Sequence, residues 1–163
     1  MATEVFKIQK GEVGFALTDP GITVEQAMIA DYSAFSCRVT RGVVTASSNF
    51  DTSEVPGSMC DPSSSNVTPS APDFSLEMDV LQDPQDDQTT GLAKFLWEND
   101  SGVTGSAVWF YLGLAEGAAP KIIGKCFISP MDFGGTPREV LTASLTFPVD
   151  GRPTPEWGTT TDV

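Results

Sequence analysis

Hydrophobic and polar residues alternate over most of two segments, residues 74–81 and residues 139–149. The apolar positions fall on every second residue: Phe74, Leu76, Met78 and Val80 in the first segment, and Leu141, Ala143, Leu145 and Phe147 in the second. Successive side chains of a strand point to opposite faces of a sheet. The alternation therefore predicts two strands, each with one face on a core and the other in water.

The remaining apolar segments predict further strands and one helix. Residues 5–17 contain two short apolar pieces with a turn at Gly11, residues 35–50 are rich in β-branched side chains, and residues 107–115 and 121–130 are apolar runs. Residues 107–115 are apolar on both faces, which is typical of a central strand. Residues 90–100 place Leu92, Phe95 and Leu96 at helical spacing, and a weaker pattern over residues 23–32 indicates one or two helical turns.

Six or seven strands with one confident helix predict a mainly β fold, an antiparallel sandwich or partial barrel with one flanking α-helix. Residues 51–72 contain four prolines and few apolar residues, which predicts a long loop that becomes ordered only in an assembly. Residues 1–151, including this loop, form the predicted single domain. Residues 152–163 form a predicted C-terminal arm that can be removed without unfolding the domain.

The charge of the chain excludes several functions. Its 163 residues include 9 Lys or Arg against 22 Asp or Glu, a formal net charge of −13, and residues 42–93 contain no cation. Affinity for nucleic acid comes mostly from cations on phosphate, so specific nucleic-acid binding is disfavoured. The chain has no histidine, which removes the usual general base and metal ligand.

Other candidate chemistry is sparse. The spacing of Cys37, Cys60 and Cys126 fits neither a zinc site nor a redox pair, and in the absence of an export signal at the N-terminus we expect three reduced thiols. A calcium site at Asp83, Asp86 and Asp87 lacks the glycine turn and distal glutamate of an EF-hand. The longest apolar stretch has nine residues and cannot span a bilayer. We therefore expect no enzyme, and no catalytic, metal or cofactor site.

Four phrases carry a resemblance to a known family: SSNFD at residues 47–51, GLAKFLWEND at 91–100, FGGTPREVL at 133–141 and LTFPVDGRP at 145–153. Together with the order of elements, they resemble the major tail tube protein of long-tailed, non-contractile bacteriophages. The last phrase is similar to tube proteins of phages with actinobacterial hosts.

The resemblance implies a structural virion protein. In this family six protomers form a ring with a β-barrel wall, and stacked rings form the tube that conducts genomic DNA into the host. The implied partners are further copies of the chain, the tape measure protein and the tail terminal proteins, while DNA passes without specific binding and no membrane is involved. The implied location is the virion tail, after synthesis in the host cytoplasm.

The implied contacts map onto named residues. Strand alternation makes Ser75, Glu77 and Asp79 the candidates for the lumen. The long loop and the C-terminal arm correspond to regions that contact neighbouring rings in the family. The candidates are Asp51, Glu54, Val55, Met59 and Val67 in the loop, and Arg152 and Trp157 in the arm.

Two alternatives remain open. One is another small β-rich virion protein, a tail terminator or a decoration protein. The other is a monomeric carbohydrate-binding or adhesion sandwich in which Trp97, Trp109 or Trp157 stacks on a sugar. That alternative requires exposed tryptophans, whereas the positions of Trp97 in a helix and Trp109 in a central strand favour burial.

Overall fold

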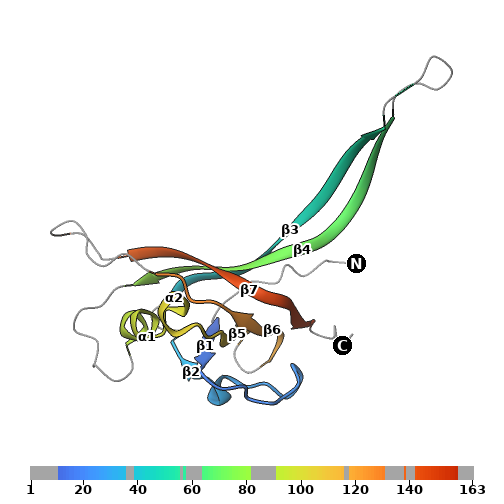
Figure 1. The fold of residues 1–163 in the computed structure, drawn as a ribbon. Coiled ribbons are helices and arrows are strands. Elements are labelled where there is room, and N and C mark those ends of the chain that lie inside the picture. Colours follow the sequence, from blue (N-terminus) through green and yellow to red (C-terminus); the bar gives the residue numbers. More distant parts are fainter. Residues whose placement is uncertain are drawn as a thin grey trace.

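Seven antiparallel strands make up most of the molecule, joined in one continuous sheet with the order β2-β1-β5-β6-β7-β4-β3 (Figure 1). The computed structural model describes residues 11–35, 39–55, 57, 64–81, 91–115, 118–130, 138 and 142–157. The strands are β1 (Glu12–Ala16), β2 (Ser33–Ala34), β3 (Val39–Val55), β4 (Ser64–Leu81), β5 (Val108–Ala115), β6 (Ala118–Cys126) and β7 (Thr142–Glu156). The helices are a 3₁₀ turn (Ile29–Asp31), α1 (Leu92–Glu98) and α2 (Ser101–Thr104). The predicted fold class is confirmed.

Strand β7 connects two layers of the sheet. Its first part, residues 142–148, pairs with β4, and its second part, residues 149–156, pairs with β6. Between Asp150 and Thr154 the register with β6 is irregular, and Gly151 has a φ of 76° in the left-handed region that glycine adopts without strain. One layer therefore contains β2, β1, β5 and β6, the other contains β7, β4 and β3, and the sheet does not close.

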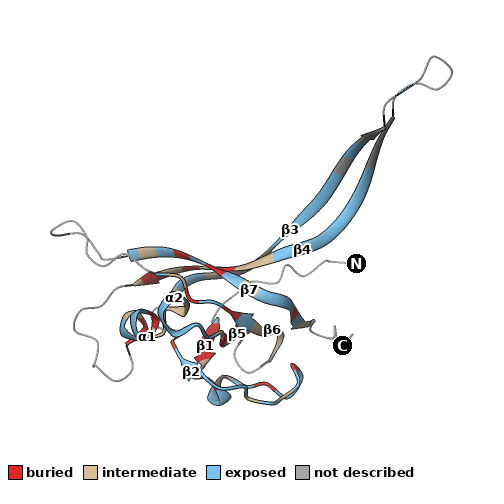
Figure 2. Cartoon of the chain, in the orientation of Figure 1, coloured by how far each residue is buried: buried red, intermediate tan, exposed pale blue. Residues whose placement is uncertain are grey.

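The core lies between these layers. Its fully buried members come from both of them and from α1, and they include Phe15, Phe110, Leu76, Met78, Phe147 and Leu96. Figure 2 shows the buried residues gathered in this body of the molecule. Both alternating strands are present: Leu76, Met78 and Val80 of β4 are buried, as are Leu145 and Phe147 of β7, while residues 139–141 of the second predicted strand lie outside the described residues. The predicted helix is confirmed over Leu92–Glu98.

Strand β5 is buried on both faces, as its sequence predicts. Phe110 faces the main core, and Tyr111 faces the opposite side, where its ring centroid lies 5.4 Å from that of Tyr32. The segment that covers this outer face contains Ala27 and Tyr32. The predicted one or two helical turns over residues 23–32 are present as a hydrogen-bonded turn at Thr23–Ala27 and a 3₁₀ turn at Ile29–Asp31.

The predicted loop over residues 51–72 is wrong for most of its length. Strand β3 continues to Val55 and β4 begins at Ser64, and their paired outer parts, residues 49–55 and 64–70, form a two-stranded ribbon. We call this part the distal ribbon; it extends away from the body in Figure 1. Prolines are tolerated in β4 because none of the described strands pairs with its other side here, so that a missing N–H can face solvent.

The predicted C-terminal arm begins too early. Residues 152–156 belong to β7 and pair with β6, and Pro153 is buried. The prolines in this part of β7 led to the prediction of an arm instead of a strand. The strand tolerates them because, among the described strands, it pairs here with β6 alone. Only Trp157 of the described residues lies beyond the strand.

Candidate assembly surfaces

The distal ribbon has an apolar face and a polar face. Phe50 lies opposite Pro69, and Val67 lies two residues before Pro69, so the three residues share one face. Phe50 is 61% exposed and Val67 is 59% exposed. The other face carries Asn49, Asp51, Thr68 and Ser70, which are also exposed.

An apolar face on a two-stranded ribbon indicates a contact surface. Two strands alone are marginally stable in water and normally need a third strand or a packed layer. Seven residues of β3 extend the ribbon by about 23 Å, so that its apolar face cannot reach the core of its own body. Neighbouring exposed apolar side chains are typical of surfaces that bind another molecule.

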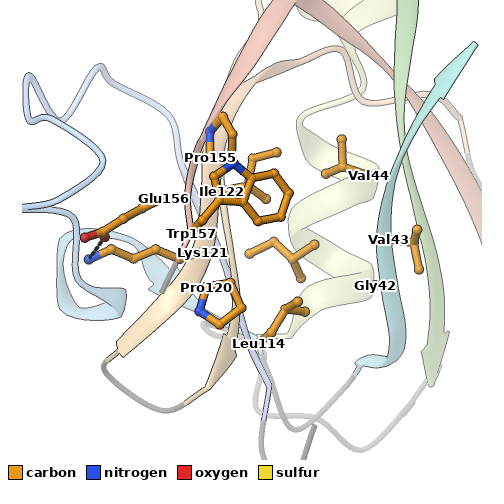
Figure 3. A pocket seen from close by; sticks show the side chains of 11 residues that line it. Gly42, Val43, Val44, Leu114, Pro120, Lys121, Ile122, Pro155, Glu156 and Trp157 are labelled. Carbon is orange, nitrogen blue, oxygen red and sulfur yellow. Dashed lines mark ion pairs between the residues drawn. The ribbon is translucent and has the colours of Figure 1, made fainter. Parts of the chain in front are cut away.

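A second apolar surface lies where β7 ends. Trp157 is 77% exposed and borders a groove of about 280 Å³ that reaches across to β3 (Figure 3). The lining is mostly apolar and includes Val43, Val44, Leu114, Pro120, Ile122 and Pro155. An exposed tryptophan beside such a groove provides a large apolar contact area for a partner.

Lys121 fixes one wall of this groove. Its side chain is 7% exposed, its Nζ donates hydrogen bonds to the carbonyl oxygens of Glu25 at 3.1 Å and Ala27 at 2.9 Å, and it lies 3.3 Å from Oε2 of Glu156. A buried ammonium group is stable only with such partners. Lys121 therefore anchors the end of β7 and the turn around Ala27, and it has a structural role.

A polar surface lies on the face of β4 that is turned away from the core. It contains the predicted residues Ser75, Glu77 and Asp79, which alternate with buried Leu76, Met78 and Val80. The register adds residues from both neighbouring strands, because Arg41 of β3 and Ser144 of β7 lie opposite Asp79, and Thr146 of β7 lies opposite Glu77.

The carboxylates of this face have partners within the chain. Arg41 Nη2 donates to Glu77 Oε2 at 3.4 Å, and Ser144 Oγ donates to Asp79 Oδ1 at 2.7 Å. The sequence analysis did not place Arg41 on this face. Arg41 immediately precedes the segment without cations, and only the pairing of β3 with β4 brings it next to Glu77 and Asp79. The face therefore carries one cation against two carboxylates.

The other predicted contact residues are scattered. Asp51 lies on the polar face of the distal ribbon, Glu54 and Val55 lie at the end of β3, and Met59 is outside the described residues. Arg152 is exposed in β7.

Among the tryptophans that an exposed sugar site would require, the predicted burial of Trp97 is wrong. Trp97 is 63% exposed on α1, whereas Trp109 is partly buried, with Lys125 Nζ 5.6 Å from its ring centroid.

The described residues offer little reactive chemistry. Cys126 is buried, and burial raises the pKa of its thiol to about 12, so it is neutral and inert at physiological pH. Cys37, Cys60 and the three aspartates weighed as a calcium site lie outside the described residues. Among the residues that are described, no three His, Cys, Asp or Glu side chains come together as metal ligands, and no helix is long and apolar enough to cross a membrane.

Comparison with known proteins gives matches at the level of structure. No family model matches the sequence, and no match was found among curated proteins. A chain in the virion of a native gene transfer agent particle aligns with a TM-score of 0.56 and 7% identity, covering 93% of this chain and 99% of the other. A chain in the tail of an empty gene transfer agent particle, from helical refinement with C6 symmetry, aligns with a TM-score of 0.51 and 9% identity, covering 76% and 86%. The likeness is one of fold.

Proposed function

We propose that this chain is a structural virion protein whose copies form hexameric rings, and that these rings stack into a phage-type tail tube. The observation that carries the proposal is the shared fold with the gene transfer agent tail, because that structure has C6 symmetry and the alignment covers 76% of this chain and 86% of the other. Fold alone does not determine function, so the surfaces of this chain must also suit assembly.

Two features of the surface support assembly. Among the described strands, β2 and β3 lie at the two ends of the sheet order, and a ring that pairs neighbouring edges removes strands that would otherwise aggregate. The distal ribbon and Trp157 present apolar side chains that extend beyond the body. We propose that they contact neighbouring copies, within a ring or between rings.

The polar face of β4 is the proposed lumen wall. A conduit for DNA must not retain phosphates, and the only cation among the facing residues described here, Arg41, is paired with Glu77. DNA would pass this wall without specific binding. Further proposed partners are the tape measure protein and the tail terminal proteins, and the proposed location is the virion.

Assembly is tested by native mass spectrometry and negative-stain electron microscopy of the purified chain across a concentration series. We expect rings or tubes with six-fold symmetry. A 17.3 kDa monomer at every concentration would contradict the proposal.

The lumen assignment is tested by replacing Glu77 and Asp79 together with lysine in phage particles. Tubes still assemble, because both side chains lie outside the core. We expect DNA ejection to become slow at low salt and to recover partly at high salt, since the new cations bind phosphates. Asp51→Lys with Thr68→Lys on the distal ribbon adds three charge units per chain, against four in the test variant, and controls for added charge away from β4. Unchanged ejection at low salt would place this face on the outside of the tube.

A further inference from the structure

The groove beside Trp157 lies between the two layers of the sheet. Strand β3 supplies one wall with Val43 and Val44, and the other layer supplies the facing wall with Leu114, Pro120, Ile122 and Pro155 (Figure 3). The groove measures about 280 Å³. A cavity of about 150 Å³ with apolar walls accepts a benzene ring. The groove therefore has room for at least one large apolar side chain.

The groove is electrically neutral, although the chain has a formal net charge of −13. Of the described residues that line it, only Lys121 and Glu156 are charged, and they form an ion pair with 3.3 Å between Nζ and Oε2. Two copies of so acidic a chain repel each other over most of their surfaces. They are therefore expected to meet where the surface is uncharged and apolar, as it is here.

The distal ribbon carries a second uncharged apolar surface, and it extends away from its own body (Figure 1). This surface consists of Phe50, Val67 and Pro69 on one face. Phe50 lies six residues beyond Val44 in β3, which places it about 20 Å further along the strand. Phe50 is therefore too far away to enter the groove of its own chain.

The size of the contact favours a second copy as the partner. An aromatic side chain buries about 150–250 Å², so Phe50, Val67 and Trp157 together bury roughly 500 Å². A specific pair of proteins buries about 1,200–2,000 Å², so a single contact of this kind is weak. A copy that offers its ribbon to one neighbour and its groove to another makes the contact twice. Because the two surfaces differ, the contact can repeat along an array of copies.

We propose that the distal ribbon of one copy inserts Phe50 and Val67 into the groove beside Trp157 of the next copy. The inference rests on the proposed self-assembly and names the two surfaces that meet. The inserted side chains contact β3 and the facing layer of the receiving copy at once. Because only the folded body presents this groove, each added copy also stabilises the body on which it docks.

Coupling between the two surfaces is measured from the assembly thresholds of Phe50→Ser, Trp157→Ser and the double variant, by sedimentation across a concentration series. We expect each single substitution to raise the threshold several-fold. The double variant should raise it no further than the larger single effect, because either substitution removes the same contact. Trp97→Ser is the matched control and should leave the threshold unchanged, since Trp97 is exposed on α1 and does not line the groove. Effects that multiply in the double variant would mean that the two surfaces have different partners, and they overturn the proposal.

Crosslinking between two cysteine variants identifies the surfaces directly. Both variants carry Cys37→Ser and Cys60→Ser and keep Cys126, which is buried. One adds Val67→Cys and the other adds Leu114→Cys. A short bismaleimide is applied at a concentration where native mass spectrometry shows assemblies. We expect a two-chain product from the mixture and little product from either variant alone.

A variant with Thr68→Cys in place of Val67→Cys is the control, because Thr68 lies on the polar face of the ribbon; it should give much less mixed product. Three results overturn the proposal while leaving self-assembly intact. They are assemblies without mixed product, equal product from the control, and a product from Val67→Cys alone, which would mean that ribbons meet each other. Monomers at every concentration would contradict self-assembly as well.

Discussion

The two halves of the β3–β4 hairpin share the same antiparallel pairing but have opposite surroundings. In the half nearer the body, residues 75–81 of β4 lie between β3 and β7 and bury Leu76, Met78 and Val80. In the distal ribbon, β3 and β4 pair with each other and with no other described strand, and Phe50 and Val67 are mostly exposed. One pair of strands thus passes from core to surface along its length.

The difference shows that strand pairing and burial serve separate purposes in this chain. The half nearer the body stabilises the fold, because its apolar face contacts both layers. The distal ribbon has the same alternation of apolar and polar faces without a layer behind it. Its apolar face is therefore available to another molecule, which agrees with the proposed role in assembly.

The largest expected effect comes from removing the end of β7 that pairs with β6 and so joins the layer of the hairpin to the other layer. Ending the chain before Arg152 removes Pro153, which is buried, and Glu156, and it leaves Lys121 buried without its ionic partner. The truncation also removes the pairing of residues 154–156 with β6, so we expect it to lower the free energy of unfolding strongly and to unfold or nearly unfold the domain. Ending the chain after Glu156 is the control and should leave the denaturation midpoint almost unchanged. Equal stability of the two truncations would show that residues 152–156 are dispensable.

Alanine substitutions in the two halves of the hairpin compare how much each half contributes to the free energy of unfolding. Met78→Ala removes a fully buried side chain from the half nearer the body, and we expect it to lower the free energy of unfolding by about 2–5 kcal/mol. Val67→Ala in the distal ribbon should change it by less than about 0.5 kcal/mol. Urea denaturation of the monomer gives both values. A similar loss in both variants would mean that the ribbon packs against its own body.

The distal ribbon should show its effect in assembly instead. Phe50→Ser with Val67→Ser leaves the monomer folded but should raise the concentration needed for assembly by about tenfold or more, because each tenfold step corresponds to about 1.4 kcal/mol of lost apolar contact. Asp51→Ser with Thr68→Ser places the same number of serines on the polar face and is the matched control. Sedimentation across a concentration series measures the threshold, and equal thresholds for the two variants would remove the apolar face from the interface.

Sequence patterns predict the half nearer the body much better than the distal ribbon. Residues 74–81 and α1 are recognisable because burial imposes a period on their apolar residues. The ribbon residues whose burial is described are all exposed, and the prolines of the ribbon resemble those of a loop. The contact between Arg41 and Glu77 could not be predicted from the sequence either. It depends on the register of β3 and β4, and the two residues are 36 positions apart in the chain. Local sequence patterns indicate which residues are buried. The register of the strands, and strands that have no layer packed against them, depend on the whole fold.

The smallest expected effect concerns titration in the body at alkaline pH. Burial, followed by the negative charge of Glu12, raises the pKa of Tyr111 from 10.0 to about 12, and burial raises the pKa of Cys126 from 9.0 to about 12. Both groups hold their protons more tightly in the folded state, so their contribution is complete below the unfolded pKa values. It is lost as the pH rises from about 9 towards 12.

We therefore expect the free energy of unfolding to fall between pH 9 and pH 11, and to fall less steeply in Cys126→Ala and Tyr111→Phe. The variants start lower at pH 8, because Cys126→Ala leaves a small cavity and Tyr111→Phe removes the hydrogen bond that the Tyr111 hydroxyl donates to Glu12 Oε2 at 3.3 Å. Urea denaturation at each pH separates the slope from this offset. Val67→Ala, whose site lies in the distal ribbon far from both groups, should keep the wild-type slope. An equally steep fall in all four proteins would show that alkaline unfolding has its origin outside these two buried groups.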